Sequence, residues 1–184
     1  IMGDGSLSSD NKRGFTVGAS GATLLNNTEY IWSFNKDINE LSNNPVFNGN
    51  LTFDGSGDFS FNNTVSETSS IALTKTGTGT LTLSAANTYT GNTTISAGTM
   101  KLTGTLNSAT DLSIASGATL DLQNTQTVAT LDLEGTISNT ANTSSLTVSG
   151  TADLGGNVTT TGTQTYTGAV TLSGAADRTL TGTT

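Results

Sequence analysis

Two carboxylates, Asp132 and Glu134, form the best pair in the sequence for acid–base chemistry. A hydrolytic site needs two such groups held in one cleft, and Ca²⁺ needs several oxygen ligands of this type. Asp121 is expected on a nearby outward face, where it would extend the pair into a small acidic cluster. However, the apolar/polar alternation places Asp132 and Glu134 on the wet side of a strand, and no partner base accompanies them. We therefore favour a solvated strand face and predict no catalytic residue, no metal site and no cofactor.

A second candidate is a row of threonines at alternate positions near the C-terminal end. Hydroxyls and methyls ordered on a flat strand surface would suit the binding of ice or glycans. Gly162 and Gly168 interrupt the row, and threonine is a common exposed residue of strands, so ordinary strand surface is the simpler interpretation. The residues of this candidate ligand face are Thr159, Thr161, Thr163, Thr165 and Thr167.

Several other kinds of site are excluded by composition. The sequence has no histidine and no cysteine, which excludes a Ser-His nucleophile, a disulfide framework and a cysteine-ligated metal. The net charge is −8, and the six basic residues are scattered, so no basic surface is present for nucleic acid or anionic lipid. No run of 18 apolar residues predicts a transmembrane helix, so we expect no membrane insertion by this chain.

The elements that must position these residues are strands. Thr, Gly, Ser and Asn dominate the composition and are poor helix formers, while apolar residues recur with a period of two. Residues 73–102 show the pattern best, with alternation at Leu81-Thr82-Leu83 and again from Ile95 to Leu102. One such unit cannot bury its apolar face alone, so it needs copies stacked above and below it.

The spacing of glycines predicts how the copies are arranged. Glycines fall every six residues from Gly150 to Gly174, and three such rungs give a coil of about 18 to 22 residues. A sandwich of hairpins would need tight Asn-Gly turns, and Asn48-Gly49 is the one such pair in the sequence. The sequence therefore predicts an all-β fold, a parallel β-helix built as a three-faced solenoid.

Individual strands and inward positions follow from the alternation. One strand is expected over residues 127–133, and Thr, Asp and Gln between apolar positions are expected to face water. Sixteen aliphatic residues are expected to point inward: Leu81, Leu83, Ile95, Leu102, Leu112, Ile114, Leu120, Leu122, Leu131, Leu133, Leu146, Val148, Leu154, Val158, Val170 and Leu172.

The stretch 73–102 resembles the passenger-associated β-strand repeat of Gram-negative autotransporters. The resemblance consists of KTGxGxLxL, then NTYxGxT, then an Ile and a Gly, with Asn92 and Met100 as departures from the family pattern. It implies a right-handed parallel β-helix carried to the cell surface, and it implies no particular activity. The matching residues are Lys75, Thr76, Gly77, Gly79, Leu81, Leu83, Asn87, Thr88, Tyr89, Gly91, Thr93, Ile95 and Gly98.

We expect residues 1–184 to be a single β-helix segment of a longer passenger. Residues 1–69 would form N-terminal coils with an atypical excursion near 29–50, including helical potential at 36–41, and residues 70–184 would form regular coils. The signal peptide and the outer-membrane attachment are expected in parts of the polypeptide outside this sequence.

The expected function is that of a non-catalytic stalk or adhesive scaffold, extracellular or on the cell surface. The alternative is a threonine-array solenoid that binds ice or polysaccharide. Expected partners are glycans, host or neighbouring-cell surfaces, or other copies of the chain stacked end to end.

Overall fold

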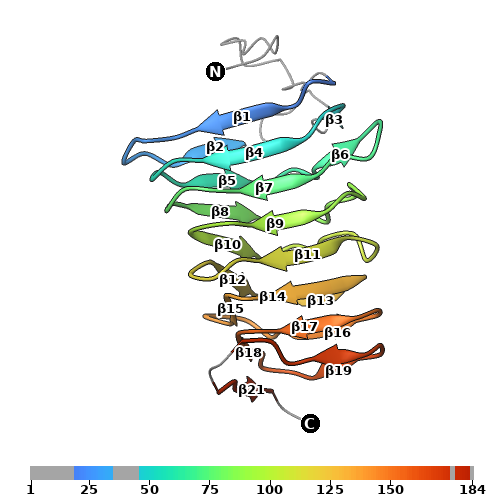
Figure 1. The fold of residues 1–184 in the computed structure, drawn as a ribbon. Helices are drawn as coiled ribbons and strands as arrows, with labels where there is room; N and C mark the ends of the chain where they lie inside the picture. The colour runs from blue at the N-terminus through green and yellow to red at the C-terminus, as the bar shows by residue number, and fades with distance from the viewer. Residues whose placement is uncertain (1–18, 35–45, 175–176, 183–184) are drawn as a thin grey trace, which may run out of the picture.

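The computed structural model describes residues 19–34, 46–174 and 177–182. Throughout these residues the regular secondary structure consists of parallel β-strands, stacked coil upon coil as a β-solenoid (Figure 1). The prediction of an all-β parallel solenoid is therefore confirmed.

The strands fall on three faces: the first two are continuous 8-stranded sheets, and the third is divided into two short sheets between β6 and β13. The first face comprises β1 (Ala22–Leu25), β4 (Leu51–Asp54), β7 (Leu73–Lys75), β9 (Thr93–Ile95), β11 (Asp111–Ile114), β14 (Thr130–Leu133), β17 (Ala152–Leu154) and β20 (Val170–Thr171). The second face comprises β2 (Trp32–Phe34), β5 (Phe59–Phe61), β8 (Thr80–Leu83), β10 (Thr99–Leu102), β12 (Thr119–Leu122), β15 (Thr136–Ser138), β18 (Asn157–Thr159) and β21 (Leu180–Thr181). The third face is covered by β3 (Val46–Phe47), β6 (Ser66–Glu67), β13 (Thr125–Val128), β16 (Ser145–Val148) and β19 (Gln164–Tyr166).

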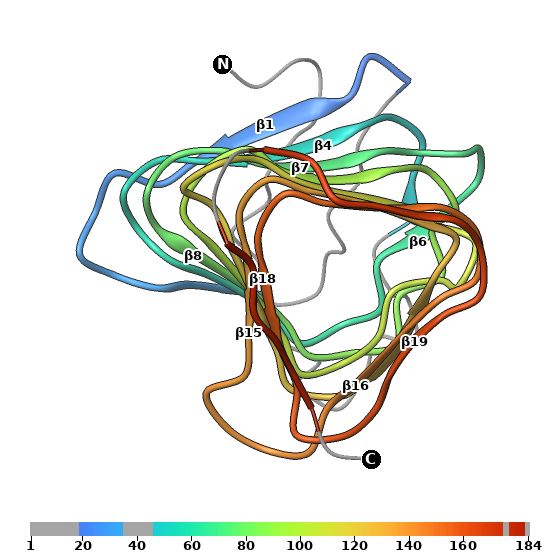
Figure 2. The same ribbon diagram turned by 60° about the horizontal axis from the view of Figure 1, so that its bottom comes forward.

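The winding of the solenoid can be followed in Figure 2, where the C-terminal end comes forward. The chain runs leftward along β1, β4 and β7, passes down the second face and returns upward through the third. A counterclockwise path that advances towards the viewer is right-handed, as the resemblance implied and as parallel crossover connections require.

The register of the strands fixes the coil length. Along the first face Leu51 pairs with Leu73, then Thr93, Leu112, Leu131, Ala152 and Val170, so these coils are 18 to 22 residues long. The first described coil is longer, because Ala22 pairs with Leu51. The glycines at six-residue spacing lie between strands, at the corners, which confirms the three rungs per coil.

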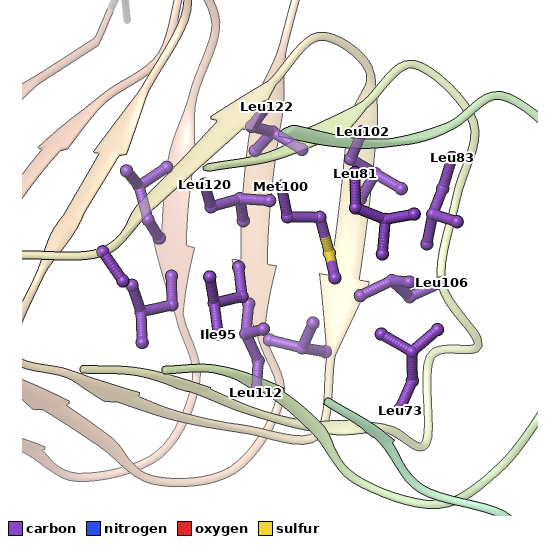
Figure 3. Close-up of a cluster of buried hydrophobic side chains, with 14 of the residues drawn as sticks. Leu73, Leu81, Leu83, Ile95, Met100, Leu102, Leu106, Leu112, Leu120 and Leu122 are labelled. Atoms are coloured by element: carbon purple, nitrogen blue, oxygen red, sulfur yellow. The ribbon is translucent and has the colours of Figure 1, made fainter. Parts of the chain in front are cut away.

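The core is a set of inward columns, one side chain per coil (Figure 3). On the second face, the register places six fully or almost fully buried residues one above another: Phe59, Leu81, Met100, Leu120, Ile137 and Val158. Each buried aliphatic side chain stabilises the fold by roughly 1.5–3 kcal/mol. At the N-terminal end the columns become aromatic, with Phe53 edge-on to Phe59 and Phe61 at 5.2 and 5.3 Å between ring centroids.

Several sequence expectations are corrected by the structure. The strand expected over 127–133 is two strands, β13 and β14, because the chain turns a corner at Ala129. The strand β15 was missed, because Ile137 is its one apolar residue. Val170 and Leu172 are 45% and 66% exposed, since among the described residues no coil packs over them.

The expectation that polar residues between apolar positions face water is also wrong at some positions. Asp121 and Gln123, which alternate with Leu120 and Leu122, are both at least nine-tenths buried. Thr93 and Gln126 are also buried, but they occupy inward positions, in register with Leu112 and Leu146. The helical potential at 36–41 lies outside the described residues.

Candidate functional site

Asn87 of the NTY motif joins three successive coils through its side chain. Its Oδ1 accepts a hydrogen bond from the Val65 N–H at 2.9 Å, and its Nδ2 donates to the carbonyls of Ala85 and Thr105, both at 3.0 Å. Asn87 is almost fully buried, and buried polar groups require such partners. Its role is to join the coils at a corner where β-strand pairing is interrupted.

Tyr89 of the same motif fills the interior beside the third face. The ring is fully buried, and its hydroxyl lies 2.7 Å from Thr93 Oγ1. Burial is the main cause that raises the pKa of Tyr89 above its ordinary value, so the phenol stays protonated at physiological pH. The pair explains why Thr93, at a polar position of the repeat, points inward.

Lys75 is the unexpected member of the core. It takes an inward position between Phe53 and Ile95 and is 1% exposed. Its ammonium reaches the corner and donates to the carbonyls of Thr76 and Gly77. Burial lowers the pKa of Lys75, and the nearby carboxylates of Asp54 and Asp58 act in the opposite direction. The lysine of the KTG motif thus stabilises the turn at Thr76 and Gly77 by hydrogen bonds from the interior.

Gly98 lies where neighbouring coils approach closely at this corner. Its φ is +68°, and an added Cβ would lie 2.5 Å and 2.6 Å from the carbonyl oxygens of Gly77 and Gly79. Only glycine provides both the left-handed backbone and the room. All the repeat residues considered so far therefore serve the stacking of coils.

A hollow of about 410 Å³ lies on the outer surface of the second face and is called the second-face hollow below. Its floor is made of hydroxyl side chains, Ser60, Thr80, Thr82 and Thr99, from β5, β8 and β10. Such a surface results from the alternation, since each outward residue lies next to its counterpart one coil away. A volume of this size is in the range of small-ligand sites, roughly 300–1,000 Å³.

Charged groups stand at the rim and centre of the second-face hollow. Lys101 is paired in register with Thr82 on one side and Asp121 on the other. Asp58 lies at the N-terminal side, where one of its oxygens accepts the Thr80 N–H at 2.7 Å. Ile31, which is 60% exposed, contributes an apolar wall. These residues were missed because they meet only through the register of coils about twenty residues apart.

Asp121 lies on an outward face, as expected, but its carboxylate is not exposed to water. It lies on the outer side of β12, but the loop at 139–144 folds over it and leaves it 6% exposed. Its carboxylate accepts hydrogen bonds from the Thr140 N–H at 3.0 Å, the Thr140 hydroxyl at 2.6 Å and Gln123 Nε2 at 2.7 Å. Asp121 therefore holds this loop against the second face.

The acidic residues considered at the outset do not meet in one place. Asp132 is exposed on the first face and Glu134 at the following corner, as predicted, while Asp121 belongs to the second face. Asp132 instead pairs in register with Asp153, a residue that sequence reasoning did not single out. Within the described part of the chain, no three acidic, histidine or cysteine residues are grouped so that they could hold a metal ion.

The five candidate threonines are all exposed, but they do not lie on one surface. Thr159 ends β18 on the second face, and Thr165 lies in β19 on the third. Thr161 is at the corner between them, where its hydroxyl accepts a hydrogen bond from the Ser144 N–H at 2.7 Å. Thr165 continues a column formed by Thr127 and Thr147 on neighbouring coils. A binding role for the five stays a prediction.

Three further findings bear on the class of protein. Over the residues that the structure covers, no helix is long and apolar enough to cross a membrane. Comparisons with curated proteins and with solved structures find no match. One family model, that of the passenger-associated-transport-repeat, matches residues 73–102. These residues therefore form an autotransporter passenger repeat, which implies a secreted or cell-surface protein.

Proposed function

We propose that this chain is a non-catalytic structural segment of an autotransporter passenger, acting as a stalk or adhesive scaffold outside the cell. One observation carries the proposal: side chains of the matched repeat are used to hold coil on coil. Asn87 joins three coils, Tyr89 and Thr93 pair in the interior, and Lys75 braces a corner.

The stacked columns support the same role. In the coils between β4 and β18 the buried apolar side chains form one contiguous core, and the strand backbones pair with the coil above and the coil below. The strands of each coil pair only with those of the coils directly above and below, so the segment extends a surface along one axis. This geometry suits a stalk or an adhesive scaffold.

Removing one coil tests this role. In the full polypeptide expressed in a Gram-negative host, deletion of Ala152–Ala169 joins Thr151 to Val170, which occupies the same place one coil later. We expect this variant to remain secreted and resistant to external protease. A control deletion of Ala152–Thr160 starts at the same residue but ends on another face, so it should lose that resistance.

Two outcomes of this experiment would contradict the proposal. If the one-coil variant stays folded and exposed but loses a chemical activity that the unaltered polypeptide has, the segment is not a mere scaffold. If both deletions have the same effect on secretion and protease resistance, the register of the coils does not determine whether the segment folds outside the cell.

A further inference from the structure

The second-face hollow lies between two loops that project from the solenoid. In Figure 2 the loop before β2 projects at the left in blue, and the loop after β15 projects at the lower left in orange. The first ends in Ile31 at the wall of the hollow, and the second covers Asp121 through Thr140. The second face is thus flanked by loops beside the hollow, while its hydroxyl floor stays open.

Lys101 is the charged group in the hollow whose hydrogen-bond donors are all unused. Among the residues that the structure describes, none forms a hydrogen bond or an ion pair with its ammonium. The carboxylate of Asp121, next to it in register, is already engaged by Thr140 and Gln123. Three N–H donors of Lys101 are therefore available to a ligand above the floor.

The other side of the hollow supplies acceptors and hydroxyls. Asp58 uses one oxygen for the Thr80 N–H, and Thr82 and Thr99 each offer a hydroxyl that can donate or accept. A ligand rich in hydroxyl groups would find both donors and acceptors here. The exposed side chain of Ile31 offers an apolar surface to the carbon face of such a ligand.

The charges that line the second-face hollow favour a neutral ligand over an acidic one. Two carboxylates and one ammonium line the hollow, and the whole chain carries −8, so an acidic ligand would be repelled. We propose that the second-face hollow binds a neutral oligosaccharide, with Lys101 and Thr82 as its central contacts. The inference deepens the adhesive part of the proposed function, on which it rests.

Titration of the ¹⁵N-labelled 184-residue chain tests the site. The neutral probes are maltotetraose, cellotetraose and chitotetraose, and the acidic probe is tetragalacturonate. We expect at least one neutral probe to shift the amide signals of Ile31, Thr82 and Lys101, with little effect from the acidic probe. Lys101→Met and Thr82→Val each remove a polar group while keeping most of the side-chain volume, and each should weaken binding about tenfold.

Thr74→Val is the matched control, because Thr74 belongs to the same repeat but lies on the outer side of the first face, paired with Thr52 and Thr94. It should leave binding unchanged, and the thermal unfolding of all three variants should remain close to that of the unaltered chain. The inference is overturned if no neutral probe shifts these signals, if only the acidic probe does, or if Thr74→Val weakens binding as much as the other two. The one-coil deletion spares every residue that lines the hollow, so failure here leaves the scaffold role standing.

Discussion

Gly98 and Gly117 provide a matched pair for testing how closely the coils approach. Both have left-handed backbones, with φ of +68° and +81°. Around Gly98 an added Cβ would meet two backbone carbonyls, whereas around Gly117 it would meet nothing within 4 Å. Replacing each by alanine therefore imposes the same backbone penalty, and only Gly98→Ala adds a collision.

The expected magnitudes follow from these contacts. A left-handed conformation costs an alanine about 1–2 kcal/mol, which is the whole expected effect of Gly117→Ala. At Gly98 the distances of 2.5 Å and 2.6 Å belong to backbone oxygens that cannot rotate away, so the two coils must separate. Overpacking of this kind costs about 1–3 kcal/mol more. Gly98→Ala should thus destabilise the chain by about 2–5 kcal/mol.

Hydrogen exchange is the appropriate assay, because a solenoid can open coil by coil and a single unfolding free energy is then poorly defined. In Gly98→Ala the free energy of opening should fall for amides of β8 and β10, next to the corner. In Gly117→Ala the loss should be smaller and centred on β11 and β12. Equal losses in the two variants would show that the close approach of Gly98 to the preceding coil is not limiting.

Three further predictions concern the core, a buried charge and an end of the stack. Leu120→Asp should lower the free energy of opening of the coils around β12 by at least about 4 kcal/mol, because the carboxylate would be buried without a partner; unchanged hydrogen exchange there would place Leu120 outside the core. Burial lowers the pKa of Lys75 in the folded chain below its ordinary 10.5. Between these two pKa values the unfolded chain binds more protons than the folded chain, so stability should rise with pH in that range. Lys75→Met should remove this rise in urea titrations run below pH 10, and persistence of the rise in the variant would assign it to another group. Amides of β20 and β21 should exchange faster than those of β8 and β10, or slow down as protein concentration increases, because Val170, Leu172 and Leu180 are about half exposed or more; uniform protection at all concentrations would contradict this.

Much of the architecture was predictable, because period-two alternation and evenly spaced glycines are local properties of the sequence. The inward positions from Leu81 to Val158 follow directly from them. Corners are harder, since Ala129 carries no signal that separates β13 from β14. The strand β15 was missed because a single apolar residue, Ile137, shows no period.

The candidate site was not predictable from local patterns. Asp121 is an outward residue of its strand, and only a loop that ends more than twenty residues later buries it. Lys75 occupies an inward position, because a long side chain can carry its charge from the core to carbonyls at a corner. The second-face hollow joins Ile31, which directly precedes β2, with Lys101 of β10, three strands further along the same sheet.

Because the coils differ in length, the number of residues in the polypeptide does not determine the height of the molecule. The coil from Ala22 to Leu51 and the shorter one from Ala152 to Val170 each raise the stack by one strand spacing, about 4.8 Å. Residues added at a corner widen the molecule without making it taller. Such corners, as at 26–31 and 139–144, can therefore accept inserted peptides while the pitch and the core stay unaltered. The number of coils thus sets the height of the molecule, and the lengths of its wide corners set how much surface projects from each coil.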